Sequence, residues 1–277
     1  MKPSSGITLG PYELIERLGH GTVTSLYRAR HTAVQGFVAV KVLHESFARD
    51  VESRRRFLHA AREHALLNHP HIANVFDYGH QDGSTYLVME LALGGSLEAR
   101  HRPMTVAELV EVLRPIAEAL DFAHAEGTCH LDVKPANILI RADGTSCLAD
   151  FGLSQVGSHA SSGLGPSEYR SPEQAKADAV GPEADQYSLA VVCREMLTGL
   201  VPYRAGSRST IAAARPGSTI RPVHGTASHL AGPVEDALDR GVAPIPSNRY
   251  PSAVGLMAAL NSAAGLPPLV RLRPGLS

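Results

Sequence analysis

The chain has 277 residues, 44% of them hydrophobic and 19% charged, which is typical of a globular protein with a sizeable core. Its 26 basic and 27 acidic residues leave a formal net charge of -1, which argues against a protein that binds nucleic acid through a broad basic surface. The three cysteines form no C-x-x-C pair, so a disulfide framework and a zinc ribbon are excluded and a reducing cytoplasm is favoured. No run of about 18 apolar residues is present, so we expect no membrane span.

The first third of the chain predicts short β-strands around one helix. A charged, alanine-rich segment over residues 50–67 carries apolar residues at helical spacing. Asp82 and Gly83 form a strong hairpin signal between the last two predicted strands. The five predicted strands are Tyr12–Leu18, Thr24–Arg30, Phe37–Leu43, Ile72–Tyr78 and Thr85–Leu91.

The pattern becomes helical after Gly94 and Gly95. Thr105 and Glu108 form the capping-box pattern T-x-x-E before a long amphipathic helix that ends near Gly127. Three further helices are expected over Asp185–Leu197, Pro233–Arg240 and Ser252–Leu260. The predicted fold class is therefore α+β with two lobes: a small antiparallel β-sheet lobe with one main helix, then a larger, mainly α-helical lobe.

Four polar residues near the middle of the chain predict a site for phosphate chemistry. Asp132, Lys134 and Asn137 lie within six positions, and Asp150 follows a short apolar run. Two carboxylates and an amide are oxygen ligands of the kind that Mg²⁺ prefers. A lysine beside them suits phosphoryl transfer, in which catalysis depends on positioning and charge neutralisation. A single Asp on a loop would be unremarkable, but the combination favours a functional site.

These residues carry a resemblance to a known family. HLDVKPAN at residues 130–137 resembles the catalytic loop of protein kinases, ADFG at 149–152 their metal-binding motif, and VAVK at 38–41 their lysine strand. The chain thus resembles a bacterial eukaryotic-like Ser/Thr protein kinase with a bilobal protein-kinase-like fold. The implied organisation is an extension over 1–11, a kinase domain over 12–262 and a flexible tail over 263–277. Within the domain, the amino-terminal lobe spans 12–91, the hinge 90–95 and the carboxyl-terminal lobe 96–262.

The resemblance implies a role for each matching residue. Asp132 would accept or orient the proton of the substrate hydroxyl, while Lys134 and Lys41 would hold phosphates of ATP. Asn137 and Asp150 would bind Mg²⁺, or Mn²⁺ in its place. The implied catalytic residues are Asp132, Lys134 and Lys41. The implied nucleotide-binding residues are Leu18, Gly19, Gly21, Leu26, Ala39, Lys41, Met89, Glu90, Ala92, Asn137, Leu139 and Asp150.

Three further features follow from the resemblance. The backbone of Glu90 and Ala92 would receive adenine at the hinge, and the ring of His130 would bond to backbone near Asp150. Arg249 resembles the arginine that pairs with the glutamate of the S-P-E motif, here Glu173. Cys129 and Cys147 lie in apolar runs and are interpreted as core thiols. The other histidines show no metal-ligand spacing.

Two departures from the family pattern lie in the amino-terminal lobe. Thr24 stands where the third glycine of the glycine-rich loop is expected. Ala60 stands where the helix should carry a glutamate that pairs with Lys41. Glu63 is the nearest acid and is displaced by about 60° around the helix, so it serves only if the helix shifts or rotates.

Two departures lie in the carboxyl-terminal lobe. Leu131 replaces the arginine that reads the phosphate on an activation segment, so we expect an enzyme that this phosphate does not switch. Ser158, Ser161 and Ser162 nevertheless remain candidate phosphorylation sites. Pro166 replaces a threonine whose hydroxyl tethers the catalytic loop.

The predicted function is ATP- and Mg²⁺-dependent transfer of phosphate to Ser or Thr of protein substrates in the cytoplasm. The alternative is a pseudokinase that binds nucleotide or serves as a scaffold, and it rests on Thr24, Ala60 and Pro166. A third reading, a small-molecule phosphotransferase, is disfavoured because SEYRSPEQ resembles a peptide platform. No nucleic-acid partner is expected, and a dimer through the amino-terminal lobe is left open.

Overall fold

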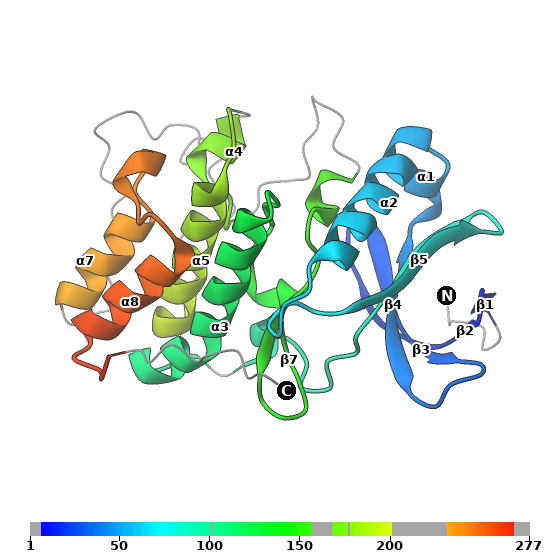
Figure 1. The fold of residues 1–277 in the computed structure, drawn as a ribbon, viewed down its shortest axis with the longest axis horizontal. Coiled ribbons are helices and arrows are strands. Elements are labelled where there is room, and N and C mark those ends of the chain that lie inside the picture. Colours follow the sequence, from blue (N-terminus) through cyan, green and yellow to red (C-terminus); the bar gives the residue numbers. More distant parts are fainter. Residues whose placement is uncertain (1–6, 101, 157–167, 177, 201–231, 269–277) are drawn as a thin grey trace.

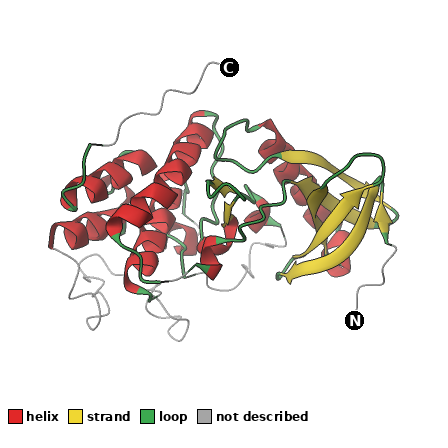
Figure 2. Ribbon diagram, turned by 90° about the horizontal axis from the view of Figure 1, so that it is seen from below, coloured by secondary structure: helices red, strands yellow, loops and turns green. Residues whose placement is uncertain are grey.

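The computed structural model describes residues 7–100, 102–156, 168–176, 178–200 and 232–268, which form two unequal lobes (Figure 1). Figure 2 shows an amino-terminal sheet at one end and a group of helices at the other. No helix among the described residues is long and apolar enough to cross a membrane. Several residues with sequence-based expectations lie outside the described part of the chain: Ser158, Ser161, Ser162, Pro166 and the tail from residue 269.

The amino-terminal lobe is built on a six-stranded sheet in the order β1-β2-β3-β4-β6-β5, with every neighbouring pair antiparallel. All five predicted strands are present: Phe37–Leu43 has the predicted bounds, and at least one end of each of the other four differs. A two-residue strand that pairs Thr8 with Glu13 was not predicted, so the sheet begins before residue 12. The strands are β1 Thr8–Leu9, β2 Tyr12–His20, β3 Thr24–His31, β4 Phe37–Leu43, β5 Val75–Gln81 and β6 Ser84–Met89.

The hairpin between β5 and β6 has the predicted turn. Asp82 and Gly83 both have positive φ, at 49° and 78°, as a two-residue turn that follows the strand twist requires. The start of β5 was predicted wrongly, because Ile72 lies outside this strand. Ile72 instead bridges in parallel to Leu148 of the other lobe, where it is buried.

One main helix accompanies the sheet, as predicted. Helix α2 spans Val51–Leu66, follows the short helix α1 Glu45–Ala48, and packs against β5, β6 and the 3-10 turn η3 Leu153–Gln155 (Figure 1). Asp50 caps α2 by accepting a hydrogen bond from the Ser53 amide at 2.8 Å. The face of α2 that carries Phe57, Ala60, Ala61 and His64 is buried, so these residues set how closely the helix approaches the centre of the molecule.

The carboxyl-terminal lobe packs its long helices around one apolar core. The predicted capping box of Thr105 and Glu108 starts helix α3, and the three further predicted helices are confirmed. Residues 264–268 fold back on the last of them, because Asn261 Nδ2 donates to the carbonyl of Pro267 at 2.8 Å. The helices are α3 Val106–Ala125, α4 Pro172–Lys176, α5 Pro182–Thr198, α7 Gly232–Gly241 and α8 Ala253–Ala263.

Short elements between α3 and η3 carry the polar residues singled out in the sequence. The 3-10 turn η2 Pro135–Asn137 leads directly into strand β7 Ile138–Ile140, which pairs with β8 Ser146–Leu148. Asp150 follows β8, and strand β7 lies between the two lobes (Figure 1). The two-stranded hairpin was not predicted, yet it places Asn137 and Asp150 side by side at its open end, since Ala149 N donates to the Asn137 carbonyl at 3.0 Å.

Candidate active site

The loop between α3 and β7 brings Asp132, Lys134 and Asn137 together. Asp132 Oδ2 accepts a hydrogen bond from Lys134 Nζ at 2.6 Å and another from Asn137 Nδ2 at 3.1 Å. Asn137 Nδ2 also donates to the main-chain oxygen of Asp132 at 2.8 Å. The ammonium and the amide thus converge on one carboxylate, which is partly open to solvent.

Asp185 of α5 anchors this loop through hydrogen bonds to its main chain. Its buried carboxylate accepts hydrogen bonds from the amides of His130 at 2.8 Å and Leu131 at 2.6 Å. Leu131 adopts a left-handed conformation with φ of 64°, which costs a non-glycine residue about 1–2 kcal/mol. The His130 ring bonds the Ala149 carbonyl at 2.7 Å, as predicted, and accepts from the Asp132 amide at 3.1 Å. These contacts fix the orientation of Asp132.

Asp150 follows β8, next to Asn137 of the loop, and is the carboxylate partner of Lys41. Lys41 Nζ donates to Asp150 Oδ2, and both side chains are largely buried. Burial raises the pKa of Asp150, but the Lys41 ammonium and the His64 and His130 rings more than offset this effect, so the pKa lies below its ordinary value. Asp150 Oδ1 is buried and has no hydrogen-bond partner.

No acid from α2 reaches Lys41. Ala60 occupies the expected position and is buried against the backbone of Gly152, where a Cβ atom added to the glycine would lie 3.3 Å from that of Ala60. Glu63 is 41% exposed and lies 3.9 Å from His59, the residue one turn earlier. The shifted-helix arrangement, in which Glu63 replaces the missing glutamate, is therefore absent from this structure.

Several residues implied to bind the nucleotide lie in one apolar cluster. Ala39 of β4, Met89 of β6 and Cys147 of β8 are buried in it, and Leu26 and Leu139 pack against it. The cluster joins strands of both lobes. Three further implied residues lie outside it: Leu18, which is exposed, and the glycines of the loop, Gly19 and Gly21.

The hinge residue Glu90 is tied to the carboxyl-terminal lobe by Arg141, which the sequence analysis missed. The Arg141 guanidinium donates to both carboxylate oxygens of Glu90 and to the Pro70 carbonyl. Burial raises the pKa of Glu90, but Arg141 and Asn74 lower it by a larger amount. Among the described residues, the Glu90 carbonyl and the Ala92 amide make no hydrogen bond, so both can face a ligand.

The glycine-rich loop is fastened by side chains that were also missed. The amide of Gly21 donates to the Thr24 carbonyl at 2.8 Å, which closes the tip of the loop. The buried hydroxyl of Ser25 joins His20 Nδ1 at 3.0 Å and His44 Nε2 at 3.1 Å. The two imidazole rings stack 4.5 Å apart. Burial and the neighbouring His20 lower the pKa of His44.

A buried ion pair joins α4 to the segment before α8 in the carboxyl-terminal lobe. Arg249 binds Glu173 through two parallel hydrogen bonds of 2.7 and 2.9 Å, as the resemblance to the family implied. Arg249 also donates to the carbonyls of Ala243 and Glu183. Because both charges are buried, loss of either partner would leave the other uncompensated.

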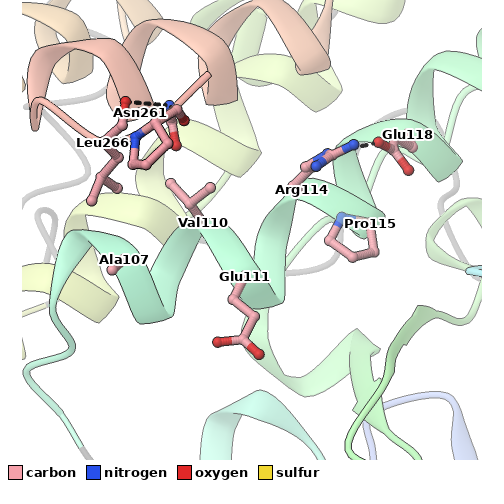
Figure 3. Close-up of a pocket in the computed structure, with 9 residues that line it drawn as sticks. Ala107, Val110, Glu111, Arg114, Pro115, Glu118, Asn261 and Leu266 are labelled. Atoms are coloured by element: carbon pink, nitrogen blue, oxygen red, sulfur yellow. Dashed lines mark hydrogen bonds and ion pairs between the residues drawn. The ribbon is translucent and has the colours of Figure 1, made fainter. Parts of the chain in front are cut away.

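A pocket of about 360 Å³ lies away from these residues, between α3 and α8 (Figure 3). Val110 and Leu266 supply apolar lining, while Arg114 is paired with Glu118 at 2.9 Å. None of the residues implied in phosphate chemistry lines it. The candidate active site is therefore the group of polar residues around Asp132 and Asp150, and this pocket is not part of it.

Comparisons with known proteins agree with this geometry. The family model for the protein kinase domain matches residues 12–234. This chain belongs to the protein kinase family. The kinase domain has the expected α+β architecture, with an antiparallel sheet in the amino-terminal lobe and helices in the carboxyl-terminal lobe.

Several mycobacterial proteins are similar to this chain. The serine/threonine-protein kinase PknH of Mycobacterium bovis is 36% identical over 288 residues, which cover 95% of this chain and 45% of PknH. PknD of Mycobacterium tuberculosis is 36% identical over 94% of this chain and 41% of PknD. A crystal structure of the PknI kinase domain of M. tuberculosis has a TM-score of 0.73 and 31% identity over 95% of this chain and 100% of that domain. The chain thus spans less than half the length of these curated relatives and all of a kinase domain.

Proposed function

We propose that this domain transfers the γ-phosphoryl group of ATP to Ser or Thr hydroxyls of protein substrates. The observation that carries the proposal is the convergence of Lys134 and Asn137 on the Asp132 carboxylate. The pseudokinase alternative finds no support in the relatives, which are named serine/threonine-protein kinases.

Asp132 is the group that would receive the proton of the substrate hydroxyl. Its backbone is held by His130 and, through the neighbouring amides, by Asp185, so the carboxylate has little freedom to turn away. Lys134 lies 2.6 Å from it and would neutralise charge on the transferred phosphoryl group. The Asp132 carboxylate would thus accept the proton, and the neighbouring Lys134 ammonium would neutralise the negative charge.

The donor set fits the Mg²⁺ ion that the family generally uses. Asp150 Oδ1 is a buried carboxylate oxygen without a partner, and such an atom is costly unless a ligand satisfies it. Asn137 uses its amide nitrogen to bond Asp132, which leaves the amide oxygen as a ligand. Mg²⁺ held by Asn137 and Asp150 would neutralise phosphate charge.

ATP would lie between the apolar cluster and Lys41. Adenine would pack against Ala39, Met89 and Leu139, and the Glu90 carbonyl and the Ala92 amide would bind its edge. Lys41 would bind the α- and β-phosphates while it keeps Asp150 as its carboxylate partner. Gly19 and Gly21 would allow the loop backbone to approach the phosphates.

Control by a phosphate on the activation segment is not expected in this domain. Leu131 carries no charge, and its peptide groups are already bonded to Asp185 and Gln174. An aliphatic side chain at this position cannot bind a phosphate as an arginine does. A dimer through the amino-terminal lobe and a cytoplasmic location stay predictions.

The proposal is tested with γ-labelled ATP, Mg²⁺ and a protein acceptor such as casein, together with autophosphorylation. Wild type should transfer label to Ser and Thr, and Asp132→Asn should lose about 10²–10⁴-fold in rate while it retains nucleotide binding. Ser188→Ala is the control for a nonspecific loss of folding, because it removes a buried hydroxyl of α5 that donates to the Tyr169 carbonyl. Nucleotide binding without transfer by wild type would overturn the proposal.

A further inference from the structure

A second cluster of metal-ligating side chains lies behind the catalytic loop. His124 ends α3, Cys129 precedes the loop, and Asp185 belongs to the first turns of α5. One ligand atom from each of the three lies within 4.8 Å of the other two, and His124 Nε2 is 2.8 Å from Asp185 Oδ2. From the sequence, Cys129 was interpreted as a core thiol and His124 was not recognised as a metal ligand. The third residue, Asp185, is more than fifty positions away along the chain, so no local spacing pattern reveals the cluster.

We propose that His124, Cys129 and Asp185 bind a thiophilic divalent cation, Zn²⁺ in the first place. Imidazole nitrogen, thiolate sulfur and carboxylate oxygen are the protein donors that Zn²⁺ takes, commonly with four ligands in a tetrahedron. Cys129 is only partly buried, so water can supply a fourth ligand. This site is separate from Asn137 and Asp150, whose oxygen donors suit Mg²⁺.

The surroundings of the cluster already resemble those of a metal site. Asp185 accepts hydrogen bonds from the amides of His130 and Leu131, and such outer contacts orient a ligating carboxylate. Burial, Asp185 and Glu183 together raise the pKa of the Cys129 thiol to about 11. The same two carboxylates that disfavour a thiolate there would attract a dication.

Binding releases protons in a defined way. The Cys129 thiol loses its proton to solvent as the sulfur–metal bond forms. His124 Nε2, which now donates to Asp185, binds the ion after the imidazole changes tautomer, so that its one proton moves to Nδ1 and the ring stays neutral. Metal binding should therefore release protons to the solvent. The ion would join the end of α3, the start of the catalytic loop and α5.

Cobalt spectroscopy tests this proposal. Co²⁺ is titrated into the domain with Mg²⁺ in excess, so that the oxygen site is saturated. A thiolate-to-cobalt absorption band should develop in wild type and in Cys193→Ala, which removes a fully buried thiol. Cys129→Ser should lose the band and bind at least about tenfold more weakly. Absence of the band in wild type, or its persistence in Cys129→Ser, would overturn the proposal.

A second measurement needs no variant. Iodoacetamide should modify Cys129 faster than the buried Cys147 and Cys193, and mass spectrometry identifies each site. Zn²⁺ should slow alkylation of Cys129 at least about tenfold, and EDTA should reverse the protection. An unchanged rate at Cys129 in saturating Zn²⁺ contradicts the proposal even if Cys129→Ser does not fold.

Discussion

The two lobes contribute unequally to the candidate active site. On the carboxyl-terminal side, Asp132 contacts Lys134 and Asn137, and Asp185 holds its loop through two further hydrogen bonds. On the amino-terminal side, Lys41 pairs with Asp150, which itself belongs to the carboxyl-terminal side. The carboxyl-terminal lobe thus fixes the groups that would perform phosphoryl transfer, and the amino-terminal lobe contributes the ammonium group of Lys41.

Helix α2 contacts the segment around Phe151 and Gly152 through packed side chains and forms no ion pair with Lys41. Ala60 lies against Gly152, and one turn later His64 lies against Phe151, with ring centroids 5.3 Å apart. A side chain as small as alanine allows this close approach. Three substitutions separate the contributions of charge, packing and titration to this arrangement, and a fourth tests the hydrogen bonds of the glycine-rich loop.

Lys41→Met is expected to have the largest effect. The substitution leaves Asp150 buried without its counter-ion, which costs about 3–5 kcal/mol of stability, and transfer should fall about 100-fold. Mg²⁺ alone should raise the melting temperature of this variant more than that of wild type, because the ion replaces the lost charge. Lys41→Arg is the control that keeps the cation. If Lys41→Met has the same melting temperature as wild type, the ion pair between Lys41 and Asp150 does not contribute to the stability of the fold.

Ala60→Glu tests whether the family's ion pair can be restored. The longer side chain must fit a buried position against Gly152, so we expect a loss of up to about 3 kcal/mol of stability and slower transfer. Arg62→Glu adds the same acid on the exposed face of α2 and serves as the control. Faster transfer at an unchanged melting temperature would show instead that the absent glutamate limits the enzyme.

His64→Leu tests the acid sensitivity of the packed interface. Burial, opposed in part by Asp150, lowers the pKa of His64 from 6.5 to about 4, so the unfolded chain binds a proton that the folded chain excludes. Stability from this group is present above pH 6.5 and is lost as the pH falls towards 4. Between pH 7.5 and 5 the loss is about 2 kcal/mol.

The measurement for His64 is chemical denaturation at both pH values. The difference in unfolding free energy between pH 7.5 and 5 should be about 2 kcal/mol smaller in His64→Leu than in wild type. His59→Leu, at an exposed position of the same helix, should leave the difference unchanged. Equal pH dependence in wild type and His64→Leu would place the acid-sensitive group elsewhere.

The sequence predicted the parts of this structure that depend on local patterns. Short apolar, strand-like segments predicted the strands, and Thr105 and Glu108 predicted the start of α3. The proximity of Asp132, Lys134 and Asn137 follows from their nearness in the chain, so a local motif was enough. The strands β7 and β8 were missed because three residues are too few for periodicity to be visible.

Contacts between distant residues could not be predicted in this way. Asp185 joins His130 across 55 positions and Arg141 joins Glu90 across 51, and no spacing rule relates them. Whether Glu63 could serve Lys41 depended on the rotation of α2, which the packing of Ala60 on Gly152 decides. Resemblance to the family supplied the Arg249–Glu173 pair, which the pattern of residues alone would not have indicated.

Ser25→Ala should have the smallest effect, because it removes one hydroxyl from the glycine-rich loop. Ser25 joins His20 to His44, so the variant loses two hydrogen bonds that fasten the loop. A loss of about 1 kcal/mol in loop positioning corresponds to an increase of about fivefold in the KM for ATP, with kcat little changed. Thr22→Ala, which removes an exposed hydroxyl from the same loop, should leave KM unaltered. If Ser25→Ala instead lowers kcat at a constant KM, the loop acts on the transfer step and not on the binding of ATP.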